Sequence, residues 1–98
     1  MNSPCIQLIA ERKAGAHKRV WGWLTNGDHA YTFWRINPRS EFIFKASETY
    51  AGERTISEKV DEKLEEHGYR EIPTVSLRYA ALAGRISGEF QSGPRRLH

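Results

Sequence analysis

The chain has 98 residues, of which 39% are hydrophobic and 28% charged, with a formal net charge of +3. This length fits one hydrophobic core, so we expect a single domain, and the aromatic residues (3 Trp, 4 Tyr and 4 Phe) favour a folded chain over a disordered one. A single cysteine, Cys5, excludes an internal disulfide and a zinc cage of thiolates. No apolar run approaches the roughly 20 residues of a membrane helix, and residues 1–14 do not resemble a secretory signal. We therefore expect a cytoplasmic protein with no membrane partner.

Four segments near the start of the chain alternate as β-strands do, at residues 5–12, 19–25, 29–36 and 41–46. Between the second and third, Asn26-Gly27 supplies the positive φ angles of a tight hairpin. Between the third and fourth, Asn37-Pro38 interrupts the ladder because proline lacks the backbone donor. The pattern predicts an antiparallel meander of about four strands. The middle strands carry large residues on both faces, so another part of the chain must cover the second face. We expect some of the aromatic rings to remain exposed.

An amphipathic helix is predicted from Thr55 to His67. Three aliphatic residues recur at intervals of four and form one stripe: Ile56, Val60 and Leu64. Thr55 and Glu58 fit a capping box, and Gly68 fits the left-handed residue that ends many helices. We expect the stripe to lie across one face of the sheet.

The last third is less regular. Tyr69 to Ile72 fits a short extended segment ended by Pro73, and residues 74–87 fit either alternation or helical spacing, of which we favour the helix. Residues 88–98 hold two glycines, a proline and little to bury, which predicts a flexible basic tail. The expected class is α+β: a compact domain over residues 1–87 with a small antiparallel sheet of about four strands, one amphipathic helix packed across it, a possible second helix, and the tail.

Charge is distributed unevenly. Residues 1–46 hold seven Lys/Arg against three Asp/Glu, residues 47–72 hold four against eight, and residues 73–98 hold four against one. A basic first half is a possible electrostatic footprint for nucleic acid, although ordinary solvated charge explains it equally well.

No catalytic, metal or cofactor motif is evident. The four histidines are scattered without metal-ligand spacing, Cys5 has no orienting partner, and the carboxylates of the predicted helix are typical of a solvated face. The chain also lacks a Gly-rich phosphate loop. We expect a protein that is not an enzyme and needs no metal or cofactor.

The remaining signal is a cluster of aromatic and basic residues in the predicted strands. Five rings lie within fourteen residues: Trp21, Trp23, Tyr31, Phe33 and Trp34. Rings among Lys and Arg can stack on bases while the cations neutralise phosphates. The competing interpretation is that the rings fill the core of a chain poor in Leu and Val.

The order of three features resembles the WGR domain over about residues 6–72. The features are Trp34-Arg35-Ile36, then a strand with Phe42 and Phe44, then a helix whose end reads KLEEHGY at residues 63–69. The chain departs from the Trp-Gly-Arg motif because no glycine separates Trp34 from Arg35. The resemblance implies a small sheet with a helix across it. It also implies contact with DNA ends through Trp34 and Arg35, as in poly(ADP-ribose) polymerases.

We therefore expect binding of DNA or RNA through Trp34 and Arg35. Four further residues are expected to contact phosphates without regard to sequence: Lys18, Arg19, Arg39 and Lys45. The alternative is a protein-binding adaptor or inhibitor, such as one encoded by a phage or mobile element, with Trp and Tyr as interface anchors. Affinity that falls steeply with salt distinguishes nucleic acid from a protein partner.

Overall fold

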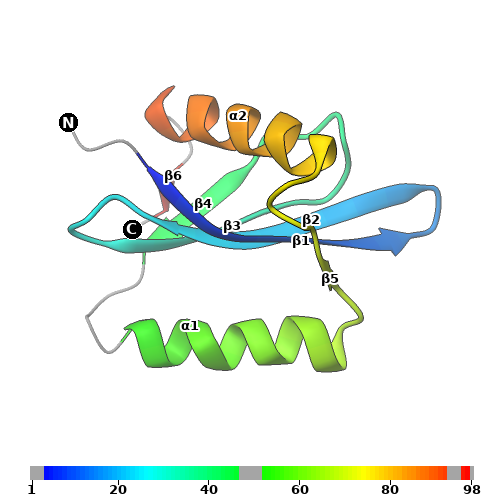
Figure 1. The fold of residues 1–98 in the computed structure, drawn as a ribbon, viewed down its shortest axis with the longest axis horizontal. Coiled ribbons are helices and arrows are strands. Elements are labelled where there is room, and N and C mark those ends of the chain that lie inside the picture. Colours follow the sequence, from blue (N-terminus) through cyan, green and yellow to red (C-terminus); the bar gives the residue numbers. More distant parts are fainter. Residues whose placement is uncertain (1–3, 47–51, 93–95, 98) are drawn as a thin grey trace.

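The structure of the chain, a computed structural model, describes residues 4–46, 52–92 and 96–97. Its strands are β1 (Cys5–Ala14), β2 (His17–Thr25), β3 (Ala30–Arg35), β4 (Ile43–Ala46), β5 (Arg70–Glu71) and β6 (Arg96–Leu97). Its helices are α1 (Gly52–Asp61), which continues into a π-helical turn (Glu62–Glu66), and α2 (Leu77–Ser92). The sheet lies between the two helices, with α1 on one face and α2 on the other (Figure 1). No helix in the described ranges is long and apolar enough to cross a bilayer.

The sheet order is β5-β1-β2-β3-β4-β6, and all neighbours are antiparallel except β4 and β6. The α+β class is confirmed, with β1 to β4 as the predicted meander and β5 as the predicted extended segment before Pro73. The second helix also forms, so each face of the sheet has its own cover (Figure 1).

The loop between β2 and β3 lies where the sequence predicts a hairpin but has a different geometry. It spans residues 26–29, and of these only Gly27 has a positive φ, at 96°. The side chain of Asn26 closes the loop instead, because its Oδ1 accepts hydrogen bonds from the backbone N–H groups of Asp28 (3.0 Å) and His29 (2.9 Å). A two-residue turn at Asn26-Gly27 is therefore wrong, while the hairpin itself is confirmed.

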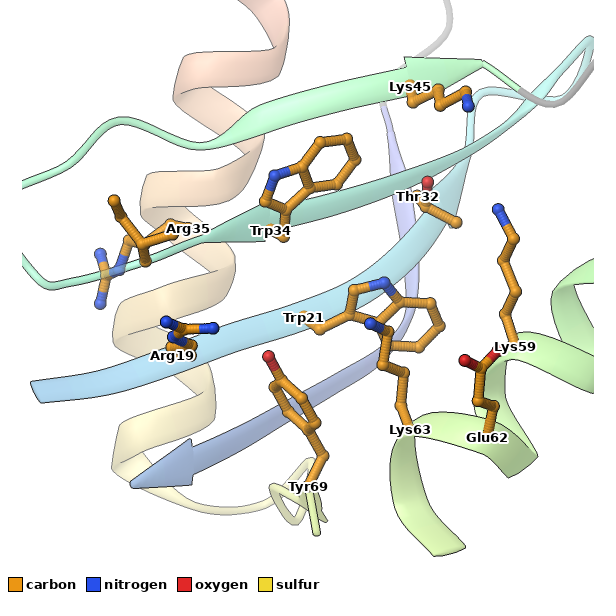
Figure 2. Close-up of a pocket in the computed structure, with 11 residues that line it drawn as sticks. Arg19, Trp21, Thr32, Trp34, Arg35, Lys45, Lys59, Glu62, Lys63 and Tyr69 are labelled. Atoms are coloured by element: carbon orange, nitrogen blue, oxygen red, sulfur yellow. The ribbon is translucent and has the colours of Figure 1, made fainter. Parts of the chain in front are cut away.

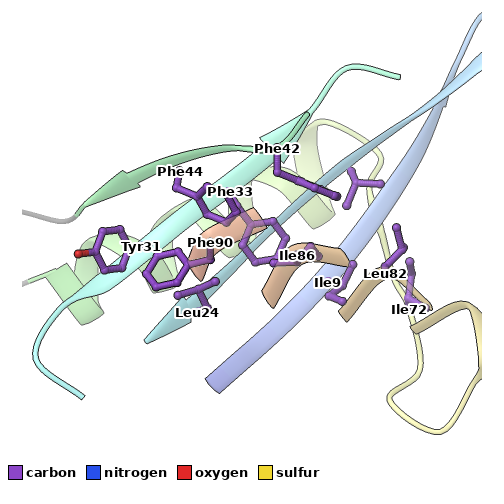
Figure 3. Close-up of a cluster of buried hydrophobic side chains, with 11 residues drawn as sticks. Ile9, Leu24, Tyr31, Phe33, Phe42, Phe44, Ile72, Leu82, Ile86 and Phe90 are labelled. Atoms are coloured by element: carbon purple, nitrogen blue, oxygen red, sulfur yellow. The ribbon is translucent and has the colours of Figure 1, made fainter. Parts of the chain in front are cut away.

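The α2 face holds the larger core (Figure 3). Strands and helix contribute large side chains that are almost fully buried: Ile9, Val20, Leu24, Tyr31, Phe33, Phe42, Phe44, Leu82, Ile86 and Phe90. The rings of Phe33 and Phe42 meet edge to face at 5.8 Å, and those of Phe44 and Phe90 at 5.2 Å. Aromatic volume thus replaces the scarce Leu and Val here, as the competing interpretation of the aromatic cluster expected.

Helix α2 runs beyond the boundary that the sequence suggested at Ser87. Residues 88–92, assigned above to a flexible tail, form its last turn, and Phe90 is only 3% exposed. The reason is tertiary: the ring of Phe90 fits against that of Tyr31 at a centroid distance of 4.9 Å. Residues 93–95 and 98 of the predicted tail lie outside the described residues.

Helix α1 covers the opposite face as predicted. Ile56 is 2% exposed, and Val60 and Leu64 pack against a second, smaller cluster of Leu8, Ala10, Trp21 and Tyr69. The helix already includes Gly52, so Thr55 lies within it and the predicted N-terminal cap at Thr55 is wrong.

The C-terminal end of this helical segment is confirmed. Gly68 has a φ of 74°, and the N–H of Tyr69 donates to the carbonyl of Lys63 at 3.0 Å. The N–H of His67 donates to the carbonyl of Glu62 at 3.1 Å, five residues back, which widens the last turn to a π-helix. This end directs the chain into β5.

Candidate nucleic-acid interface

A hollow of about 430 Å³ lies between the helix and strands β2 to β4 (Figure 2). We call it the basic groove, and its charged and aromatic lining consists of Arg19, Trp21, Trp34, Arg35, Lys45, Lys59, Glu62, Lys63 and Tyr69. The sheet forms its floor, and α1 with the following π-helical turn forms one wall.

Strand register places the floor residues side by side. Trp21 of β2 pairs with Trp34 of β3, and Thr32 of β3 pairs with Lys45 of β4. Alternate residues of a strand share a face, so Arg19 lies on the same face as Trp21. The alternation of side chains along these strands therefore places two cations, Arg19 and Lys45, and two indoles, Trp21 and Trp34, on one face of three adjacent strands.

The wall contributes Lys59 and Lys63, which are four residues apart and so lie on one side of the helix. Their position follows from the Ile56, Val60 and Leu64 stripe, which fixes how the helix rests on the sheet. The Nζ of Lys63 lies 5.8 Å from the centroid of the Tyr69 ring, a cation–π contact.

Four cations of the groove form no ion pair within the part of the chain that the structure describes. Among the described residues, no carboxylate lies within 4.0 Å of the charged groups of Arg19, Lys45, Lys59 or Lys63. Glu62 is the one carboxylate in the described lining, and its Oε1 pairs with Nε2 of His67 at 3.0 Å. The groove is therefore a site of net positive potential.

Glu62 itself remains ionised. The hydrogen bond from His67 is the largest effect and lowers the pKa of Glu62, desolvation opposes it, and the charges of His67, Lys63 and Lys59 lower the pKa further. A second hollow, of about 440 Å³, lies along α1 and is lined by uncharged residues, including Trp23, Ile56 and Val60. Of these two hollows, only the basic groove is lined by charged residues.

Four of the residues predicted from the sequence line the basic groove, namely Arg19, Trp34, Arg35 and Lys45. Lys18 does not, because it follows the opposite face of β2 and pairs with Glu11 at 3.8 Å. Arg39 is exposed in the loop between β3 and β4, outside the lining.

Arg35 borders the groove through its position in β3, but its guanidinium lies on the other face of the sheet. The residue is 4% exposed, and its Cζ lies 4.8 Å from the centroid of the Phe42 ring. Its Nε is buried without a hydrogen-bond partner. Burial lowers the pKa of Arg35, and the nearby charges of Arg85 and Arg78 lower it further. Trp34 and Arg35 therefore do not form one contact surface.

The sequence alone did not identify Lys59, Lys63, Thr32 and Tyr69 as lining residues. The detectable signal is a pair of lysines at i and i+4 beside an apolar stripe. The acidic balance of residues 47–72 obscured that signal, because the carboxylates point mainly to solvent while the two lysines border the sheet.

One set of three possible metal ligands comes together in the described residues, at Glu62, Glu66 and His67, with ligand atoms within 4.8 Å of one another. All three side chains are exposed, and Glu62 and His67 already pair with each other. Exposed acidic groups commonly occur without a bound ion, and this set alone does not indicate a metal site. The expectation that the protein needs no metal stays a prediction.

No family model, no curated protein and no solved structure matches this chain. The resemblance to the WGR domain accordingly stays a prediction.

Proposed function

We propose that the protein is a non-catalytic module that binds nucleic acid in the basic groove. The observation that carries the proposal is the convergence of Arg19, Lys45, Lys59 and Lys63 around a half-buried Trp34. Cations without ion pairs at this density attract an anionic partner, and a chain of phosphates supplies several charges at once.

Each class of lining residue has a role in this proposal. The four cations neutralise phosphates, which gives affinity without sequence preference. Trp34 offers an accessible ring for stacking on a base or sugar. Tyr69, 8% exposed, supports the wall under Lys63 and contributes little surface of its own.

The proposal keeps Arg19, Trp34 and Lys45 from the sequence prediction and adds Lys59 and Lys63. It assigns no contact to Arg35, since a ligand in the groove lies across the sheet from its guanidinium. It also assigns none to Lys18 or Arg39, which lie outside the groove.

The test is binding of fluorescently labelled DNA and RNA oligonucleotides, measured by anisotropy at low salt. The double variant Lys59→Gln/Lys63→Gln should weaken binding roughly tenfold or more, because two phosphate contacts are lost. The matched control is Lys13→Gln/Lys18→Gln, which removes the same charge from a facing pair at the end of the β1–β2 hairpin. The control should bind within about twofold of wild type.

An equal loss in both double variants would contradict the proposal, because net charge rather than the groove would then set affinity. Undetectable binding by the wild-type chain would favour a protein partner.

A further inference from the structure

The floor of the basic groove holds polar groups that lack partners. Thr32 is 5% exposed and Trp21 is 4% exposed, and both line the groove (Figure 2). Within the described part of the chain, neither the Thr32 hydroxyl nor the Trp21 indole N–H makes a hydrogen bond. Neither atom belongs to the fully buried polar atoms that lack a partner, so both groups open into the hollow and can bond the polar edge of a ligand that enters it.

The position of Trp34 limits which form of nucleic acid can reach it. Its ring is half-buried on the floor, beside Trp21, with the helix wall at one side. A base within a duplex is covered on both faces by its neighbours and presents only its edge in a groove, whereas an unpaired base can turn its face onto an aromatic ring.

The size of the hollow agrees with this limit. A volume of about 430 Å³ lies in the range of small-ligand sites and leaves no room for a double helix. A hollow of this size suits one nucleotide of a strand that lies along it.

The charge outside the groove also opposes a duplex. Four further carboxylates of the helical segment are exposed, namely Glu58, Asp61, Glu65 and Glu66, and Glu66 lies beside Glu62 of the lining. A duplex wide enough to straddle the wall would bring its second strand of phosphates against these carboxylates. A single strand between Lys59 and Lys63 on the wall and Arg19 and Lys45 on the floor meets positive charge on both sides.

We propose that the basic groove is selective for unpaired strands, with one base stacked on Trp34 and its polar edge bonded by Thr32 and Trp21. This inference rests on the proposed function and specifies its ligand. DNA and RNA share the chemistry, so both are used in the test.

The experiment compares a labelled single strand of about 12 nucleotides with the same strand annealed to its complement, as DNA and as RNA. We expect the single strand to bind at least about tenfold more tightly. Trp34→Leu should reduce single-strand affinity by roughly tenfold and leave the weak duplex binding almost unchanged. The matched control is Trp23→Leu, which truncates a half-buried indole in the uncharged hollow and should bind within about twofold of wild type.

Thr32→Val keeps the shape of the side chain and removes its hydroxyl, so it tests the floor even if Trp34→Leu fails to fold. It should lower single-strand affinity several-fold at unchanged thermal stability. Unchanged single-strand affinity in Thr32→Val would overturn the role of the floor. Equal affinity for duplex and single strand, or equal effects of the two Trp variants, would overturn strand selectivity. If duplex and single strand bind equally and Lys59→Gln/Lys63→Gln weakens the binding, the proposed function stands and strand selectivity is wrong. If neither duplex nor single strand binds, both the proposed function and the selectivity are wrong.

Discussion

Trp34 and Arg35 are consecutive residues of β3, and the sheet separates their side chains. The indole of Trp34 lies in the basic groove, whereas the Cζ of Arg35 lies 4.8 Å from the centroid of Phe42 on the α2 face. A pair that reads as one motif in the sequence therefore has two roles in space. Trp34 belongs to the candidate site, and Arg35 belongs to the packing under α2.

Arg35→Met should leave nucleic-acid affinity unchanged and raise the free energy of unfolding by up to about 1 kcal/mol. Methionine keeps the apolar stem over Phe42, and it removes a buried cation that has no hydrogen bond at Nε and faces the charges of Arg85 and Arg78. Urea denaturation measures the free energy of unfolding, and anisotropy measures the affinity. A variant with wild-type stability and a tenfold loss of affinity would return Arg35 to the site.

Gly22→Ala should destabilise the fold by about 3 kcal/mol or more. An added Cβ would collide with the carbonyl oxygen of Leu8 and lie 2.5 Å from Cζ of Phe33, and neither the strand backbone nor a fully buried ring can move aside cheaply. Gly84→Ala is the matched control, because nothing lies within 4 Å of its added Cβ on the exposed side of α2. It should stabilise the protein by about 0.5 to 1 kcal/mol. Thermal denaturation of both variants checks the pair, and similar midpoints would contradict the packing of β1 and β3 around β2.

Phe90→Ala should cost about 3 to 5 kcal/mol of stability, because its ring fills the end of the main core against Tyr31 and Phe44. Gln91→Ala, at the next and exposed position, should change stability by less than about 0.5 kcal/mol. Chemical denaturation distinguishes the two. If Phe90→Ala behaved like Gln91→Ala, the end of α2 would be the flexible tail expected from the sequence.

The period-two and period-four patterns predicted β1 to β4 and the stripe of α1 because both depend on local sequence. The end of α2 was missed for a different reason. Gly88 suggests disorder, while the burial of Phe90 depends on Tyr31, far away in the sequence. Likewise, the cap predicted at Thr55 failed because the helix already includes Gly52.

The candidate site was only partly predictable. Alternation in β2, β3 and β4 fixes the face of Arg19, Trp34 and Lys45 once the strands are paired. Which lysines of the acidic helix meet that face depends on how the helix rests on the sheet, and this orientation is set by long-range packing of Ile56. The net negative charge of residues 47–72 gave no indication that Lys59 and Lys63 line the groove.

Glu62→Gln should raise affinity for oligonucleotides roughly two- to fivefold at neutral pH. The pKa of Glu62 is lowered mainly by its hydrogen bond with His67, so the carboxylate is ionised there and repels phosphates. The pair of Glu62 with His67 stabilises the fold above the unfolded-state pKa of Glu62 and is lost as the pH falls through the lower folded-state pKa. A protonated Glu62 no longer repels phosphates, so the gain in affinity from the substitution should shrink in acid. Glu65→Gln, also exposed but outside the lining, serves as the control. Equal gains in both variants would show a general charge effect.

The central claim is that four cations of one groove neutralise phosphates, and the dependence of binding on salt tests it most directly. For a single strand contacted by Arg19, Lys45, Lys59 and Lys63, a plot of log K against log salt concentration should have a slope of about −2.8. Lys59→Gln/Lys63→Gln should reduce the slope to about −1.4, and Lys13→Gln/Lys18→Gln should leave it unchanged. A flat plot for the wild-type chain, or the same slope for both double variants, would contradict the account.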